Sequence, residues 1–202
     1  MLKILINESD TMFRHGMKCF LRDLFWQIFR RKTEFIIDYT PGNIADADVI
    51  ILSMCNGEGY TCFPELRARS KGIIIGLVDE SQHHRSPFCF KDIVYITRRE
   101  TLEMTRYKIF STWNNWLVSK TIPQYINCRG CQHYTLSLQQ RDILERIYKG
   151  NSIHEIAADM NVTYKTVMAH KYIVMKKFGL KNDYELCTLF GRMQERFRKL
   201  VS

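Results

Sequence analysis

The sequence predicts two domains, an N-terminal α/β domain followed by an all-α domain of four helices. In the N-terminal part, short apolar runs alternate with helical or looped segments, which is typical of a doubly wound parallel sheet. In the C-terminal part, apolar residues recur every three or four positions between helix start and stop signals. A length of 202 residues suits two small domains. We predict domains at 1–118 and 136–202, joined by a linker at 119–135.

Five short apolar runs in the N-terminal domain are predicted to be buried parallel strands. They lie at 2–6, 35–39, 48–54, 72–78 and 93–97. The apolar spacing predicts a helix from Asp10 to Phe25 and a final helix from Glu100 to Val118. Only about eight residues separate the second strand from the third, so we expect the second helix of this domain to be nearly absent.

Two short helices joined by a tight turn are predicted between Ser152 and Lys171, which is the plan of a helix-turn-helix. Ser152 and Glu155 form a capping-box pattern, so the first helix is expected to begin there. Asn161–Val162 are predicted to make the turn, with the valine as its apolar plug. Thr163 is expected to cap the second helix.

The second helix, which is expected to end at Gly179, carries one apolar face and one polar face. A B-DNA major groove is about 12 Å wide and accepts one α-helix, whose first turns lie nearest the base edges. The residues that we expect to contact DNA are Thr163, Tyr164, Lys165, Thr166, Met168, Ala169, Lys171, Tyr172 and Lys176. Of these, we place Lys165, Met168, Ala169 and Tyr172 at base edges, and Thr166, Lys171 and Lys176 at phosphate oxygens.

Three motifs of the C-terminal domain occur together at a characteristic spacing. They are LSLQQRDIL at 136–144, IAADMNVTYKTVMAHK at 156–171 and KKFGLKNDYEL at 176–186. With these motifs the domain resembles the LuxR/FixJ-type (GerE-like) family, which implies sequence-specific binding of double-stranded DNA and transcription regulation. Gln139 and Gln140 stand where the family usually has Arg-Glu. Met168 and Ile173 replace a basic residue and an Asn, which leaves the base preference open.

The N-terminal domain resembles a response-regulator receiver in the order of its elements but lacks the receiver's chemistry. That chemistry needs an acidic pair after the first strand to hold Mg²⁺, an Asp at the end of the third to accept phosphate, and a Lys after the fifth. This chain has Asn7 and Glu8, Ser53, and Thr97 with Arg98 in those places. A serine cannot form an acyl phosphate and one carboxylate is a poor Mg²⁺ cage, so we expect regulation that is independent of phosphorylation.

The two-domain layout resembles RcsA-like auxiliary regulators of enterobacteria, which pair with a full response regulator to control surface-structure genes. The resemblance implies a homodimer or a heterodimer with another response regulator. In the last helix, apolar residues spaced four, three, four and three apart predict a dimer seam. They are Leu186, Phe190, Met193, Phe197 and Leu200.

The formal net charge of +9 is concentrated in the C-terminal part of the chain. Residues 1–118 hold 16 basic and 14 acidic residues, and residues 119–202 hold 14 and 7. A basic excess in one domain indicates a polyanionic partner, and its spread over several helices favours nucleic acid over a membrane surface. No apolar run approaches the roughly 20 residues that span a bilayer, and no secretory signal is expected. We therefore expect a cytoplasmic protein that is nucleoid-associated when bound to DNA.

Two other functions stay open at this point. One is an antagonist that captures another regulator and needs no DNA contacts of its own. The other is a thiol- or metal-responsive sensor that uses Cys128 and Cys131, near His133 in the linker. That pair has no fourth ligand at a regular spacing, and His83–His84 are expected to be solvated. The sequence has no nucleophile motif and no Gly-rich phosphate loop. We therefore expect that the protein is not an enzyme and that it binds no cofactor and no metal.

Overall fold

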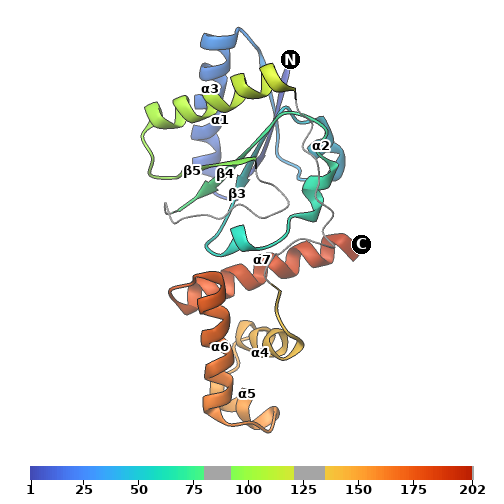
Figure 1. Ribbon diagram of the computed structural model, residues 1–202, viewed down its shortest axis with the longest axis vertical. Helices are drawn as coiled ribbons and strands as arrows, with labels where there is room; N and C mark the ends of the chain where they lie inside the picture. The colour runs from blue at the N-terminus through green and yellow to red at the C-terminus, as the bar shows by residue number, and fades with distance from the viewer. Residues whose placement is uncertain (80–91, 121–134, 202) are drawn as a thin grey trace. The chain divides into compact units, whose positions relative to one another are not determined.

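A computed structural model of the protein describes residues 1–79, 92–120 and 135–201, which form two compact units (Figure 1). The first unit holds the sheet and helices α1 to α3. The second unit holds helices α4 to α7 together with the segment Cys55–Thr61, which includes the 3₁₀ helix η1 (Glu58–Tyr60). Near the end of α7, the side chains of Phe197 and of residues 199–201 lie outside the described set.

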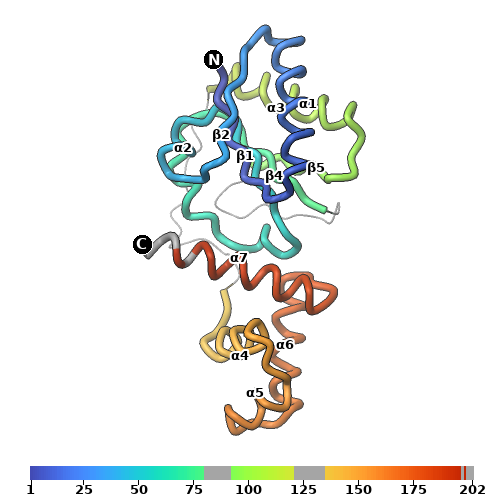
Figure 2. The backbone as a smooth tube through the Cα atoms, turned by 180° about the vertical axis from the view of Figure 1, so that it is seen from behind, coloured from blue at the N-terminus to red at the C-terminus, as the bar shows by residue number. Residues whose placement is uncertain are grey.

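The first unit is built on a parallel sheet of five strands in the order β2-β1-β3-β4-β5. Figure 2 labels β2, β1, β4 and β5 from left to right. The strands are β1 (Leu2–Asn7), β2 (Thr33–Ile36), β3 (Val49–Ser53), β4 (Ile73–Val78) and β5 (Ile93–Thr97). β3 and β4 are buried along their whole length, as expected of strands that are covered on both faces. The predicted α/β class of this domain is confirmed.

Helices cover both faces of the sheet (Figure 1). They are α1 (Thr11–Phe29) and α3 (Leu102–Ser119) on one face, and α2 (Pro41–Asp46) with the 3₁₀ helix η2 (Pro64–Ala68) on the other. Aromatic rings fix α1 against α3. Phe25 meets Trp113 edge-on with ring centroids 5.4 Å apart, and Phe29 stacks on Phe110 at 5.8 Å.

The end of α1 differs from the prediction. The helix continues past Phe25 to Phe29, because the later aromatic ring packs on α3 and extends the apolar face. It then stops at Arg30, which adopts a left-handed conformation with a φ of 51°. Its N–H donates to the carbonyls of Phe25 and Trp26, which satisfies the end of the helix.

The edge strand β2 starts and ends earlier than the predicted 35–39. Its pairing with β1 begins at Leu2 opposite Thr33. The carbonyl of Asp38 accepts hydrogen bonds from the Thr40 N–H and the Asn43 side chain, so this part of the chain already turns toward α2. α2 has six residues, which confirms that the second helix of the domain is nearly absent.

The four predicted helices of the second unit are confirmed. They are α4 (Leu138–Tyr148), α5 (Ile153–Asp159), α6 (Tyr164–Phe178) and α7 (Asp183–Val201). Leu144, Val174 and Phe190 belong to an apolar cluster between α4, α6 and α7. Ile156 and Val167 belong to a second cluster that joins α5 to α6. No helix among the described residues is long and apolar enough to cross a membrane.

α4 begins at a complete capping box despite its departure from the family pattern. The Ser137 N–H donates to Oε1 of Gln140 at 3.1 Å, and the Gln140 N–H donates to Oγ of Ser137 at 3.2 Å. A glutamine therefore satisfies the first turn of the helix without a charge.

Candidate nucleic-acid interface

α5, the first helix of the helix-turn-helix, begins at the predicted capping box. The Ser152 N–H donates to the Glu155 carboxylate at 2.7 Å, and the Glu155 N–H donates to Oγ of Ser152 at 3.3 Å. The hydrogen bond from the Ser152 backbone N–H, with a smaller contribution from its side chain, holds the pKa of the exposed Glu155 carboxyl below its usual range. The start of α5 is thereby confirmed.

A tight turn joins α5 to α6. Asn161 takes a left-handed conformation with a φ of 53°, and the Val162 N–H donates to the Ala157 carbonyl at 3.0 Å. Val162 packs partly buried against the cluster between the two helices, as predicted for an apolar plug. Oγ1 of Thr163 accepts the Thr166 N–H at 3.2 Å and caps α6.

One side of α6 is exposed while the other lies in the core. Val167, Val174 and Phe178 are at most 1% exposed, whereas Tyr164 and Tyr172 are 43% and 59% exposed. Of the other predicted contact residues, Thr163, Lys165, Ala169 and Lys176 are exposed, and Thr166 and Met168 are half-buried. These side chains therefore lie along one accessible side of a single helix, α6. Figure 1 shows α6 beside α5.

Lys171 differs from this row and from its predicted place at a phosphate. Its side chain is 11% exposed, and its Nζ lies 2.6 Å from Oδ2 of Asp183 at the start of α7. Lys171 follows Val167 by four residues and precedes Val174 by three, so it lies in the buried row of α6, where Asp183 of α7 supplies a carboxylate. The ammonium is therefore engaged within the unit.

Two residues of the interface were missed by the sequence reasoning. The exposed ring of His154 stacks on Tyr164, with centroids 4.7 Å apart and an interplanar angle of 26°. Asp183 is the partner of Lys171. The stacked pair joins the second residue of α5 to the first residue of α6, a distance in sequence that no single-helix pattern covers. The tight turn predicted at Asn161–Val162 is the one signal from which the contact between the two helix starts could have been predicted.

The predicted dimer seam on α7 is partly taken up by the core. Leu186 and Phe190 are 1% and 4% exposed, and both pack in the cluster with α4 and α6. These two residues cannot face a partner as predicted, because their side of α7 covers its own domain. Met193 is half-buried, and the side chains of Phe197 and Leu200 lie outside the described set.

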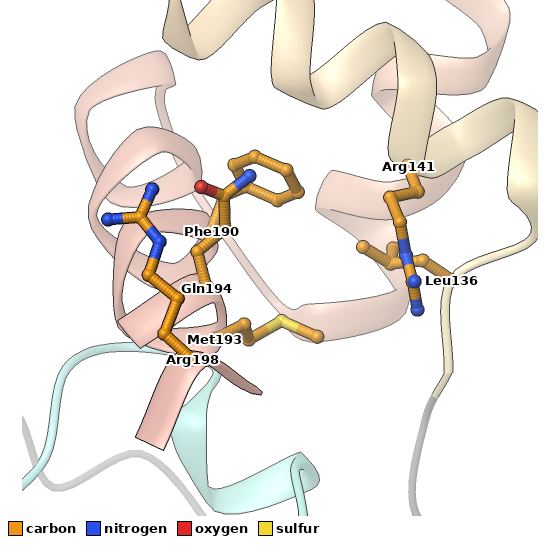
Figure 3. Close-up of a pocket in the computed structure, with 6 residues that line it drawn as sticks. All are labelled: Leu136, Arg141, Phe190, Met193, Gln194 and Arg198. Carbon is orange, nitrogen blue, oxygen red and sulfur yellow. The ribbon is translucent and has the colours of Figure 1, made fainter. Parts of the chain in front are cut away.

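A pocket of about 280 Å³ lies between the start of α4 and α7 (Figure 3). Leu136 and Arg141 line one side, and Phe190, Met193, Gln194 and Arg198 of α7 line the other. Apolar side chains and two guanidinium groups thus line the same pocket. The pocket adjoins the predicted seam, because Phe190 and Met193 belong to both.

The carboxyl ends of β1 and β3 carry the residues that replace the receiver's reactive groups. Glu8 and Ser53 are buried at 5% and 4% exposure. Arg98, after β5, donates from Nη2 to Oγ of Ser53 at 2.7 Å and lies 2.5 Å from Oε2 of Glu8. Asn7 is the last residue of β1, and Thr97 is the last residue of β5.

The possible sensor residues Cys128, Cys131 and His133 lie outside the described residues, as do His83 and His84. Within the ranges 1–79, 92–120 and 135–201, no three or more His, Cys, Asp or Glu side chains are placed to hold a metal ion together.

Residues 134–190 match the family described as bacterial regulatory proteins, luxR family (GerE). This stretch contains α4, α5, α6 and the first turns of α7, and thus the whole helix-turn-helix. The chain carries a LuxR-family domain. The resemblance that the sequence motifs indicated is confirmed, and the exposed row on α6 belongs to this LuxR-family domain.

Two relatives are similar over different shares of their length. The Fimbriae W protein of Salmonella typhimurium (strain LT2) is 23% identical over 189 residues, which are 92% of this chain and 92% of that protein. The oxygen regulatory protein NreC of Staphylococcus aureus is 32% identical over 142 residues, which are 70% of this chain and 60% of NreC. The chain thus spans less than two thirds of NreC.

Solved structures of the regulator RcsB share the fold. RcsB from Salmonella enterica serovar Typhimurium, bound to the promoter P1flhDC with phosphomimetic BeF₃⁻, has a TM-score of 0.52 at 18% identity and covers 93% of this chain and 97% of its own. A structure of two RcsB dimers on two parallel DNAs has a TM-score of 0.51 at 16% identity, with 94% and 98% covered. The predicted receiver-like domain followed by a LuxR-family domain is confirmed.

Proposed function

We propose that the protein binds a specific DNA sequence by placing α6 in the major groove. The observation that carries this proposal is the exposed side of α6, where Lys165, Tyr172 and Lys176 lie along a helix whose other side is buried. Lys165, Met168, Ala169 and Tyr172 reach base edges, and Lys176 contacts phosphate. We keep 1–118, 119–135 and 136–202 as the proposed receiver-like domain, linker and DNA-binding domain.

Mobility-shift titrations of the native promoter at several salt concentrations test the contact row. Replacing Lys165 by Ala should weaken binding by about 1–3 kcal/mol, and replacing Lys176 by Ala should lower the salt slope by about one. Lys32→Ala, an exposed lysine of the first unit, is the matched control and should bind like wild type. Wild-type binding by both α6 variants would contradict the groove assignment.

Regulation by this protein is proposed to be independent of phosphorylation. Ser53 stands in the acceptor place, and Arg98 pairs with the lone carboxylate of Glu8 in the metal place. Incubation with Mg²⁺ and acetyl phosphate or a cognate kinase should therefore leave the protein unmodified on phosphate-affinity gels. A shifted band that disappears in Ser53→Ala would contradict this part of the proposal.

The target genes are proposed to encode bacterial surface structures, and the protein is proposed to act with a partner regulator at the nucleoid in the cytoplasm. Similarity to the Fimbriae W protein over 92% of both chains supports the choice of surface-structure genes. RcsB forms dimers on DNA in one of the similar structures, which supports a dimeric arrangement. Genome-wide footprinting in the native host tests the gene assignment, and sites far from surface-structure genes would contradict it.

A further inference from the structure

The receiver fold implies a Mg²⁺ site at the carboxyl ends of β1 and β3, and the residues of this chain do not fit one. Mg²⁺ requires several oxygen ligands in near-octahedral geometry. Among the described residues at this edge of the sheet, Glu8 follows β1 and Asp79 follows β4, and each carries a carboxylate. A positively charged guanidinium group already lies between them.

That group belongs to Arg98, which connects the ends of four strands. Its Nη2 lies 2.5 Å from Oε2 of Glu8 after β1 and donates to Oγ of Ser53 in β3 at 2.7 Å. Its Nε lies 2.9 Å from Oδ1 of Asp79, the residue after β4. The side chains of Glu8 and Arg98 are 2% and 22% exposed, so water and salt screen this pair little.

Residues at the start of α1 contact both members of the Glu8–Arg98 ion pair. The Asp10 N–H donates to Oε1 of Glu8 at 2.9 Å, and Nη1 of Arg14 donates to the Glu8 carbonyl at 2.6 Å. The guanidinium carbon of Arg98 lies 4.7 Å from the centroid of the Phe13 ring. Oε1 of Glu8 thus accepts a backbone hydrogen bond, and Oε2 forms an ion pair with Arg98.

We propose that Arg98 is a built-in cation that occupies the place of Mg²⁺ and holds the ends of β1, β3, β4 and β5 in one fixed arrangement. The inference deepens the proposed phosphorylation independence, on which it rests for its regulatory meaning. Because this positive charge is part of the chain, the domain does not respond to the concentration of a free cation. Removing the guanidinium leaves the buried carboxylate of Glu8 uncompensated, and a divalent cation then binds between Glu8 and Asp79.

The test compares full-length wild type with Arg98→Ala, and uses Arg99→Ala as the control because Arg99 is the adjacent, exposed arginine. Thermal unfolding is followed by circular dichroism with and without MnCl₂, and bound Mn²⁺ is measured by electron paramagnetic resonance. Wild type and Arg99→Ala should not respond to Mn²⁺. Arg98→Ala should lose roughly 5–10 °C in Tm, regain part of it with Mn²⁺, and bind the ion. Adding Glu8→Gln to Arg98→Ala should remove both the loss and the response.

Three results would overturn the role of Arg98. They are binding of Mn²⁺ to wild type as tight as to Arg98→Ala, an Arg98→Ala Tm equal to that of wild type, and a lowered Tm that Mn²⁺ does not change. If Arg98→Ala does not fold, Arg98→Gln is measured instead, since it keeps a donor for Ser53 but no charge. Phosphate transfer to wild type would contradict the proposed function separately, because that assay involves no Arg98 variant.

Discussion

Lys171 shows that a basic residue expected to contact DNA can instead be engaged in the fold. It lies in the buried row of α6 with Val167 and Val174, and its Nζ pairs with Asp183 at 2.6 Å. A helical wheel contains one helix only, so it cannot show which neighbouring element covers a position. The carboxylate that decides the role of Lys171 comes from twelve residues further along the chain.

Replacing Lys171 by Met should leave DNA binding almost unchanged. The methionine keeps most of the packing of the lysine stem and removes a charge that Asp183 already neutralises. We expect the affinity to stay within about twofold and the salt slope to stay within a few tenths of wild type, in contrast to Lys176→Ala. Mobility shifts at several salt concentrations measure both. A slope lowered by about one would show that Lys171 contacts phosphate after all.

The stacked pair of His154 and Tyr164 should act as one unit in DNA binding. The imidazole ring holds the exposed tyrosine at the first residue of α6, where a recognition helix approaches base edges. We expect His154→Ala to weaken binding about two- to fivefold in wild type and to have no further effect in a Tyr164→Ala background. Tyr172→Ala provides the control background, because Tyr172 is exposed on the same helix but is not part of the stacked pair. In that background His154→Ala should keep its full effect on binding. Additive losses of His154 and Tyr164 would contradict the coupling.

Among the helices, replacing a glycine by alanine should change the stability in opposite directions at Gly179 and Gly16. Gly179 ends α6 in a left-handed conformation with a φ of 67°, where a Cβ adds strain. Gly16 lies inside α1 with open space around its Cα, where a Cβ costs nothing. We expect Gly179→Ala to destabilise its unit by about 1 kcal/mol and Gly16→Ala to stabilise its own unit by about 0.5–1 kcal/mol. Chemical denaturation measures both, and the same sign for both would refute the argument.

Helix starts and buried strands were predicted well because their signals are local. Ser152 and Thr163 cap the helices that they were expected to cap, and β5 has the predicted bounds. The end of α1 and the position of β2 were predicted less well. Both depend on partners distant in sequence, since Phe29 packs on α3 and β2 is placed by its pairing with β1.

In the candidate site, too, local features were predicted and contacts between elements were not. The spacing of apolar residues along α6 was sufficient to predict the exposed row, because one helix carries all of it. The ion pair of Lys171 and the stacking of His154 join two elements, and the bonds of Arg98 join four strand ends. Contacts of this kind exist only once the chain has folded, so residue patterns within one segment do not contain them.

At the scale of the whole molecule, assembly through α7 has to be separated from folding of the LuxR-family domain. Phe190 is 4% exposed in the core, so Phe190→Asp should destabilise that domain by about 3 kcal/mol or more rather than only dissociate a dimer. Tyr184→Asp, at an 80% exposed position of the same helix, should fold normally. Thermal unfolding combined with analytical ultracentrifugation measures both effects. A Phe190→Asp protein that is stable but monomeric would restore Phe190 to the seam.

The tryptophans of α1 and α3 also determine what fluorescence spectroscopy can measure on this protein. All three tryptophans of the chain, Trp26, Trp113 and Trp116, lie in the first unit, and the LuxR-family domain has none. Trp113 is 5% exposed against Phe25, whereas Trp26 is 48% exposed. Tryptophan emission therefore follows the receiver-like unit alone, with one indole open to a soluble quencher and another shielded. A change in tryptophan emission on binding of DNA to the LuxR-family domain would have to be transmitted from a domain that contains no indole of its own.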